Sequence, residues 1–179
     1  MVRVSLPLAL GALVSFTIAT PVAATQNLEE ASKGFRFEDW ANAIAANPDG
    51  EHLSPEEAIQ VFNAADIQDH HQVAKRDDVT CNSRGLPRAS LADSVTCINQ
   101  LAARGSANCH IPYAGGATLC QFGLAEIHGA TVNRAGSVLP CQTFAASAGR
   151  ILDICVRPGD TTVQGNNHPN QNIQITLAQ

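Results

Sequence analysis

The sequence predicts an α+β fold: a two-layer α/β sandwich in which two helices cover one face of an antiparallel sheet, cross-linked by three disulfides. Three observations support this prediction. Segments 91–104 and 140–155 carry apolar residues at helical spacing. Short extended segments surround them, and the last, 173–177, alternates strictly between apolar and polar residues. All six cysteines fall in this part of the chain, and an even number in a small secreted domain predicts disulfides.

Residues 1–24 have the layout of a secretory signal peptide. Arg3 supplies a positive charge, an apolar run covers 4–19, and small residues lead to a cleavage site after Ala24, with Ala19 as the second choice. The run contains Gly, Ser and Thr and is shorter than the about 20 apolar residues that a membrane-spanning helix needs. We therefore expect a secreted, extracellular product without a membrane anchor.

Residues 25–76 form an acidic pro-segment that ends in a dibasic pair. The segment has ten acidic residues, four basic residues and no cysteine. Its last two residues are Lys75 and Arg76, and no lysine follows them. The pair resembles the cleavage site of a kexin-type protease of the late secretory pathway, so processing proteases are expected partners. A chance Lys-Arg pair is the alternative.

Two short helices are predicted within the pro-segment, at 37–46 and 54–65. In the second helix Ser54 can act as the N-cap, Pro55 suits the first helical position, and Glu57 completes a capping box. We expect the segment to assist folding or to keep the domain inactive in transit. Disorder is the alternative that the sequence leaves open.

Residues 77–179 form the predicted mature domain, and their composition argues against two classes of partner. Six acidic residues balance six arginines, so the acidity of the precursor, with its net charge of −5, lies in the pro-segment. A neutral domain gives no electrostatic support for binding nucleic acid or an anionic membrane. The few aromatic residues, Tyr113, Phe122 and Phe144, also argue against a base-stacking surface.

The cysteines favour disulfides over a metal site. They are Cys81, Cys97, Cys109, Cys120, Cys141 and Cys155. No Cys-x-x-Cys pair occurs, and the two nearest cysteines are eleven positions apart, whereas structural zinc sites use tighter spacings. We therefore expect no metal and no cofactor. Six cysteines permit many pairings, and the sequence leaves the choice among them open.

The elements of the mature domain are expected in the approximate order β-α-β-β-α-β-β. Extended segments are predicted at 79–81, 109–111, 117–127, 161–164 and 173–177. Gly105 suits the end of the first helix, and Gly123 is a candidate bulge in the long strand. A connection is expected at 129–136, and 165–172 is interpreted as a polar loop, either a recognition loop or a solvated connection.

The cysteine placement and the order of elements resemble those of a family of secreted fungal proteins. The matching features are the segment Val-Thr-Cys-Asn-Ser-Arg-Gly at 79–85, the strand Thr-Leu-Cys-Gln-Phe-Gly at 118–123, the two cysteine-bearing helices and the last strand. They resemble the calcium-channel-blocking killer toxins of smut fungi and related fungal effectors. Cys120 to Gly123 also resembles a strand of the extracellular necrosis-inducing effectors. The resemblance implies a two-layer sandwich and a toxic or virulence role.

Two departures limit what the resemblance implies. The smut toxin has more cysteines, and its activity is attributed to exposed basic side chains that include lysine. Residues 77–179 contain no lysine. The resemblance therefore supports the fold and secretion more than it supports channel blockade.

We expect a non-enzymatic, cysteine-rich secreted effector that binds an unknown protein target in a host or competing cell. The alternative is a ribonuclease-like hydrolase that uses Glu126 and His128, which are two residues apart on an expected strand and so share one face. A carboxylate beside an imidazole can perform acid–base chemistry, and Arg134 could stabilise a phosphate. An ordinary polar pair is the simpler interpretation, and a cell-wall or surface protein is a third possibility. Other acid–base candidates are His110, His168, Asp93, Asp153 and Asp160.

Overall fold

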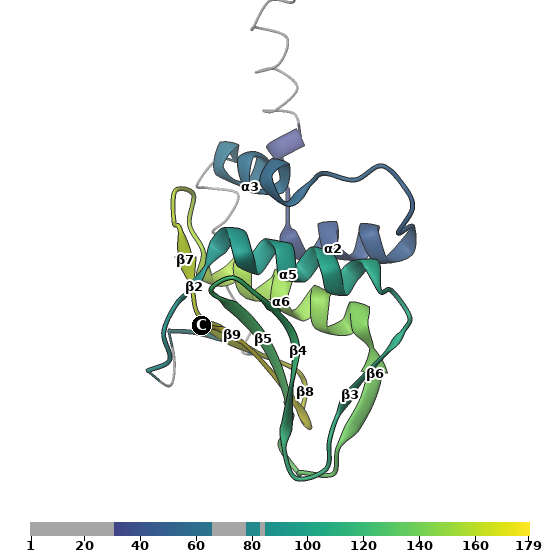
Figure 1. Ribbon diagram of the computed structural model, residues 1–179. Coiled ribbons are helices and arrows are strands. Elements are labelled where there is room, and N and C mark those ends of the chain that lie inside the picture. The colour runs from purple at the N-terminus through teal and green to yellow at the C-terminus, as the bar shows by residue number, and fades with distance from the viewer. Residues whose placement is uncertain (1–30, 66–77, 83–84) are drawn as a thin grey trace, which may run out of the picture.

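The structure is a computed structural model that describes residues 31–65, 78–82 and 85–179. These residues form three layers (Figure 1): an antiparallel sheet, helices α5 and α6 on one face of that sheet, and helices α2 and α3 on the far side of α5 and α6. Ala24, Lys75 and Arg76 lie outside the described residues, so the two cleavage sites stay predictions.

The main sheet has five strands in the order β1-β8-β9-β5-β4, and every neighbouring pair is antiparallel. The strands are β1 (Val79–Cys81), β8 (Gly165–Asn170), β9 (Ile173–Ala178), β5 (Ala125–Thr131) and β4 (Gly116–Phe122). Successive side chains of a strand point to opposite faces. Ile127, Ile175 and Leu177 are fully buried in the core beneath the helices, and the residues between them form the outer face.

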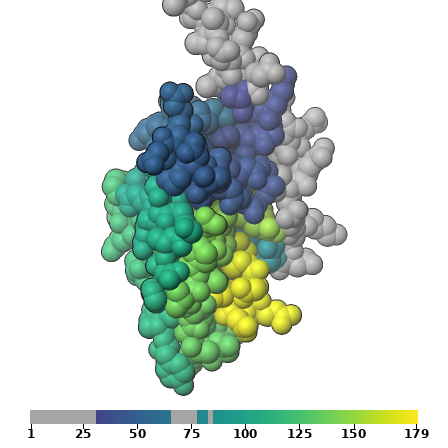
Figure 2. Space-filling view, turned by 90° about the vertical axis from the view of Figure 1, so that its right-hand side faces the viewer, coloured from purple at the N-terminus to yellow at the C-terminus, as the bar shows by residue number. Residues whose placement is uncertain are grey.

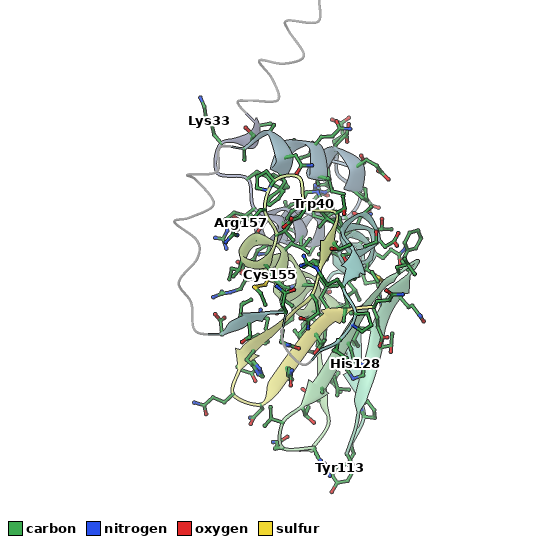
Figure 3. The ribbon with its side chains drawn as sticks, turned by 90° about the vertical axis from the view of Figure 1, so that its left-hand side faces the viewer. Lys33, Trp40, Tyr113, His128, Cys155 and Arg157 are labelled. Carbon is green, nitrogen blue, oxygen red and sulfur yellow. A yellow bond between two sulfur atoms is a disulfide. The ribbon has the colours of Figure 1, made fainter. Side chains whose placement is uncertain are left out.

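Two smaller ribbons flank the main sheet. Strand β2 (Ala89–Ser90) pairs with β7 (Thr162–Val163). Strand β3 (Asn108–Ile111) pairs with β6 (Ser137–Pro140) and forms an arm that meets β4 and β5 at one end of the molecule (Figure 1). Tyr113 lies at the tip of this arm, points away from the molecule (Figure 3) and is 80% exposed.

Helices α5 (Leu91–Ala103) and α6 (Cys141–Cys155) form where the apolar periodicity predicts them. The Ser90 hydroxyl accepts a hydrogen bond from the backbone N–H of Asp93 and caps α5. After Arg104, Gly105 adopts a positive φ of 51° and ends the helix. Both apolar stripes are buried in one core with the sheet. The predicted α+β fold, with two helices on one face of an antiparallel sheet, is therefore confirmed.

Helices α2 (Phe37–Ala46) and α3 (Pro55–Ala64) confirm the helices predicted in the pro-segment. The capping box is present, because Glu57 N donates to Ser54 Oγ at 3.2 Å and Ser54 N donates to Glu57 Oε2 at 2.8 Å. Phe37 and Phe62 are fully buried and belong to the same core cluster as α5 and α6. Disorder is therefore the wrong alternative for residues 31–65, which form an additional layer of the molecule.

The three predicted disulfides are present and resolve the open question of their pairing. Cys81 bonds to Cys155 and joins β1 to the end of α6. Cys97 bonds to Cys120 and joins α5 to β4. Cys109 bonds to Cys141 and joins β3 to the start of α6.

The prediction of one long strand over 117–127 is wrong. The chain turns at Gly123, which has a positive φ of 51°, and continues as β5 in a hairpin with β4. Asp93 Oδ2 accepts a hydrogen bond from Leu124 N at 2.8 Å and supports this turn. The irregularity lies instead between Thr118 and Cys120. Because β5 extends through Thr131, part of the predicted connection 129–136 is also strand.

The interpretation of 165–172 as a polar loop is also wrong. Most of it is β8, which lies between β1 and β9. Two of its amide side chains are buried and hydrogen-bonded: Asn167 Nδ2 donates to Ser147 O at 3.3 Å, and Asn166 Oδ1 accepts from Thr176 Oγ1 at 2.7 Å. Polar residues can occupy a central strand when such partners exist.

Candidate functional site

Glu126 and His128 lie side by side on the outer face of β5. Figure 3 shows His128 on the sheet, away from the helices. Glu126 Oε1 is 3.4 Å from His128 Nδ1 and accepts a hydrogen bond of 2.6 Å from Thr118 Oγ1 on β4. The two residues therefore share one face of a strand, as their spacing predicts.

Residues of the neighbouring strands surround His128. His128 pairs with Thr118 on β4 and with Thr176 on β9, and Thr176 pairs with Asn166 on β8. Gly116 lies beneath the ring, where the Cβ of any other residue would collide with the His128 ring. These contacts form a row of polar side chains across the sheet.

A pocket of ≈ 250 Å³ opens at this pair. The described residues that line it are Leu86, Glu126, His128, Thr176, Ala178 and Gln179. The side chains of Glu126 and His128 are 35% and 39% exposed, so water screens their interaction and the contact adds little stability. The arrangement can exchange a proton with a small ligand in the pocket.

The other acid–base candidates are not brought to this pocket. Arg134 lies in the turn after β5, where its backbone carbonyl accepts a hydrogen bond from Ala114 N, and it is not among the described lining residues. Asp160 accepts a hydrogen bond from Arg157 N after α6. His110 and His168 are exposed on β3 and β8.

Asp153 occupies a different and deeply buried position, on the side of α6 that faces α2. Its Oδ1 accepts a hydrogen bond from Phe37 N at 2.7 Å, and its Oδ2 accepts one from Glu38 N at 3.1 Å. Arg36 Nε lies 3.7 Å from Oδ2. Burial raises the pKa of Asp153 to about 7, against the opposing effects of the two backbone N–H groups and Arg36.

Residues 76–179 match the model of a family described as Domain of unknown function (DUF8794). The match covers more than half of the chain. The chain belongs to this family. Neither a curated protein nor a solved structure matches the sequence.

The DUF8794 domain begins at the second residue of the Lys75-Arg76 pair and contains all six cysteines. Helices α2 and α3 precede it. Thus the family domain has nearly the bounds of the mature domain that the sequence predicts. Within the described part of the chain, no helix combines the length and hydropathy needed to span a bilayer.

Sequence reasoning missed several residues that shape these two sites of the DUF8794 domain. Thr118 and Thr176 reach His128 only through strand pairing, for which the sequence gives no local signal. Gly149 did carry a signal, because an isolated glycine is unfavourable within a helical pattern. A Cβ at Gly149 would lie 2.7 Å from the backbone of Phe37 and Glu38.

Proposed function

We propose that this chain is the precursor of a small secreted effector, similar to fungal killer toxins, whose mature domain binds a protein target in a host or competing cell. One observation carries the proposal. All three disulfides lie within 81–155, whereas the pro-segment contains no cysteine. Helices α2 and α3 are therefore attached to the domain by noncovalent contacts and by the chain that includes Lys75-Arg76.

This division suits a protein that is processed and then works outside the cell. Disulfides persist in oxidising compartments and are typical of small secreted domains. Cleavage after Arg76 would leave every cross-link intact. Each disulfide stabilises the remaining domain by about 2–4 kcal/mol, which helps a domain whose buried core contains Phe144 while Tyr113 and Phe122 are exposed.

The composition of the mature domain indicates recognition by shape. Its acidic residues and arginines balance, so long-range attraction contributes little to finding a partner. The disulfides join α5 and α6 to the sheet and to the arm. A scaffold held in this way loses little conformational entropy on binding.

The test is to express the full precursor in a secreting host and to analyse the protein in the medium. We expect a product that starts at Asp77, gains six hydrogens on reduction, and arrests growth or causes necrosis in plant or fungal cells. The variant with Lys75→Ala and Arg76→Ala is the matched control and should be secreted uncleaved. An uncleaved product of full potency would contradict the proposed processing, and a mature product without any cellular effect would contradict the effector role.

A ribonuclease-like hydrolase is the second candidate, favoured by the contact between Glu126 and His128 at a pocket. It predicts RNA cleavage by the mature protein that His128→Ala abolishes and Glu126→Gln reduces. His168→Ala, on the exposed part of β8, is the control. Intact RNA after incubation with the mature protein would end this hypothesis.

A further inference from the structure

Helix α2 covers the side of α5 and α6 that faces away from the sheet (Figure 2). The purple and blue segment 31–65 lies on the teal and green surface of these two helices. On α6, Asp153 and Gly149 contact the start of α2. At the other end of α2, Ala45 O lies 3.5 Å from where a Cβ of Gly105 would be. We call this surface of α5 and α6 the α2-binding face.

The contacts of α2 follow the pattern of a helix bound to another protein. Its buried residues are Phe37, Trp40, Ala41 and Ile44, which stand at i, i+3, i+4 and i+7. This is the spacing by which an amphipathic helix places apolar side chains on a partner's surface. The opposite side of α2, with Asn42, is exposed.

Asp153 recognises the N-terminus of this helix. The N-cap of α2 is Arg36, whose side chain makes no capping hydrogen bond among the described residues. The first backbone N–H groups of a helix need acceptors from elsewhere, and the two oxygens of Asp153 accept from Phe37 N and Glu38 N. A carboxylate also interacts favourably with the positive end of a helix dipole.

Gly149 sets how closely the incoming helix can approach. It lies one helical turn before Asp153, and its missing Cβ leaves room for the backbone of α2. Glycine within a helix lowers its stability by about 1 kcal/mol relative to alanine. The α2-binding face thus keeps a residue that is unfavourable for α6 itself and useful for contact with a second helix.

We propose that the α2-binding face is the surface through which the DUF8794 domain binds its target, and that the target presents an amphipathic helix with an uncapped N-terminus. Helix α2 holds this position in the precursor. The inference rests on the proposed function, because the pro-segment must be cut from the domain before another helix can take its place. The partner helix should carry large apolar side chains at the positions of Phe37, Trp40 and Ile44.

The test uses the full precursor, cleaved after Arg76 with a kexin-type protease. The probe is a peptide of residues 35–47 with a fluorophore at its C-terminus, and binding is measured by fluorescence anisotropy. We expect the cleaved precursor to bind the probe and the uncleaved precursor to exclude it. Asp153→Asn should weaken binding at least about tenfold, because it replaces one of the two acceptor oxygens with an amide group. Gly149→Ala should have an effect of similar size, because its Cβ would lie 2.7 Å from the backbone of the bound helix.

Two controls separate recognition from misfolding. Circular dichroism and thermal unfolding should show Gly149→Ala to be folded, with α6 unchanged or stabilised. Among peptide variants, Trp40→Ala should lose binding and Asn42→Ala, on the exposed side, should keep it. A probe that binds the variants as tightly as it binds the original protein would overturn the inference. A pro-segment that stays bound after cleavage and does not exchange with the probe would also overturn the inference.

A cell assay distinguishes this inference from the proposed function. Both are supported if the cleaved protein is toxic and the two variants lose toxicity together with probe binding. If the variants lose probe binding and keep full toxicity, the inference is wrong and the effector role stands. If the cleaved protein binds the probe without affecting cells, helix binding by the α2-binding face is supported and the effector role is wrong.

Discussion

Asp153 shows how one residue acquires its properties from a contact across the fold. Only 3% of this residue is exposed, and its carboxylate accepts two hydrogen bonds from a helix 115 and 116 positions earlier in the chain. In the sequence alone, nothing distinguishes Asp153 from an ordinary acidic residue on a helix. The same holds for Gly149. Its place on α6 can be read from the helical spacing, but only the folded structure shows that it faces the backbone of α2.

The raised pKa of Asp153 makes the docking of α2 depend on pH. Two charged side chains at the start of α2 face it. Burial is the main cause that raises its pKa to about 7, the nearby Glu38 carboxylate acts in the same direction, and Arg36 opposes it. When α2 leaves, the carboxyl becomes exposed and its pKa returns towards the ordinary value of 3.8. The docked state therefore binds the proton more tightly. Docking is strongest below about pH 4 and weakens as the pH rises towards about 7. Over this range its equilibrium constant falls by up to about tenfold per pH unit.

This pH dependence can be followed through Trp40, the only tryptophan in the chain and buried in the docked state. The measurement is its emission maximum in the cleaved precursor, titrated from pH 4 to pH 8 at fixed concentration. We expect a shift to longer wavelength as the pH rises, and a flatter profile in Asp153→Asn. Asp49→Asn, in the exposed turn between α2 and α3, is the control. A complex that tightens with rising pH would contradict the assignment.

Phe144 is the only aromatic residue of 77–179 that lies in the described core. Its replacement by alanine leaves a cavity between α6 and the sheet, and we expect a loss of about 3–5 kcal/mol in the free energy of unfolding. Tyr113→Ala, at the exposed tip of the arm, should change stability by less than about 0.5 kcal/mol. Urea unfolding of the two variants checks the prediction. Equal losses would show that the core does not depend on Phe144.

At the scale of elements, the helices were predictable, whereas strands β2, β6 and β8 were not. Ser54, Pro55 and Glu57 specify the start of α3 through contacts within one turn. By contrast, β8 consists largely of asparagines whose partners lie on α6 and β9. Such residues are typical of loops when read locally. Glu126 and His128 could be placed together from their spacing, but the threonines around them come from neighbouring strands.

The disulfides differ in the length of chain that each one closes. Cys81–Cys155 spans 74 positions and Cys97–Cys120 spans 23. In the chain-entropy model the longer loop gives the larger stabilisation, about 4.4 against about 3.4 kcal/mol. We expect Cys81→Ala with Cys155→Ala to lower the free energy of unfolding by about 1 kcal/mol more than Cys97→Ala with Cys120→Ala. Denaturant titrations of both double variants check this order, and a reversed order would contradict it.

At the scale of the whole molecule, segment 31–65 belongs to the same core as the domain that follows it. Phe37 and Phe62 are 5.0 Å apart between ring centroids and are fully buried together with residues of α5 and α6. The sequence predicted two layers. The third layer, formed by α2 and α3, could not be predicted because the apolar face of a helix does not specify which surface it will contact. Asn63 Oδ1 accepts a hydrogen bond from Gly159 N and extends this contact beyond the helices.

A shared core predicts that the uncleaved precursor unfolds as one cooperative unit. During a urea titration, Trp40 emission and far-ultraviolet circular dichroism should change with the same midpoint, because the release of α2 exposes part of the common core. Phe62→Ala should shift both signals together. If the Trp40 signal changes at clearly lower urea, then α2 and α3 form a separate, weaker unit.

The noncovalent attachment of α2 has a consequence for the proposed processing that follows from mass action. In the intact chain the helix stays beside its binding face, because a covalently linked segment has an effective concentration of the order of millimolar. Once the tether is cut, occupancy depends on the amount of free pro-segment in the surrounding solution. Dilution into the medium would then empty the face although no residue of the domain has changed. Hydrolysis of a single peptide bond would thus convert a stable intramolecular contact into a bimolecular complex. This complex dissociates as the protein is diluted away from the producing cell.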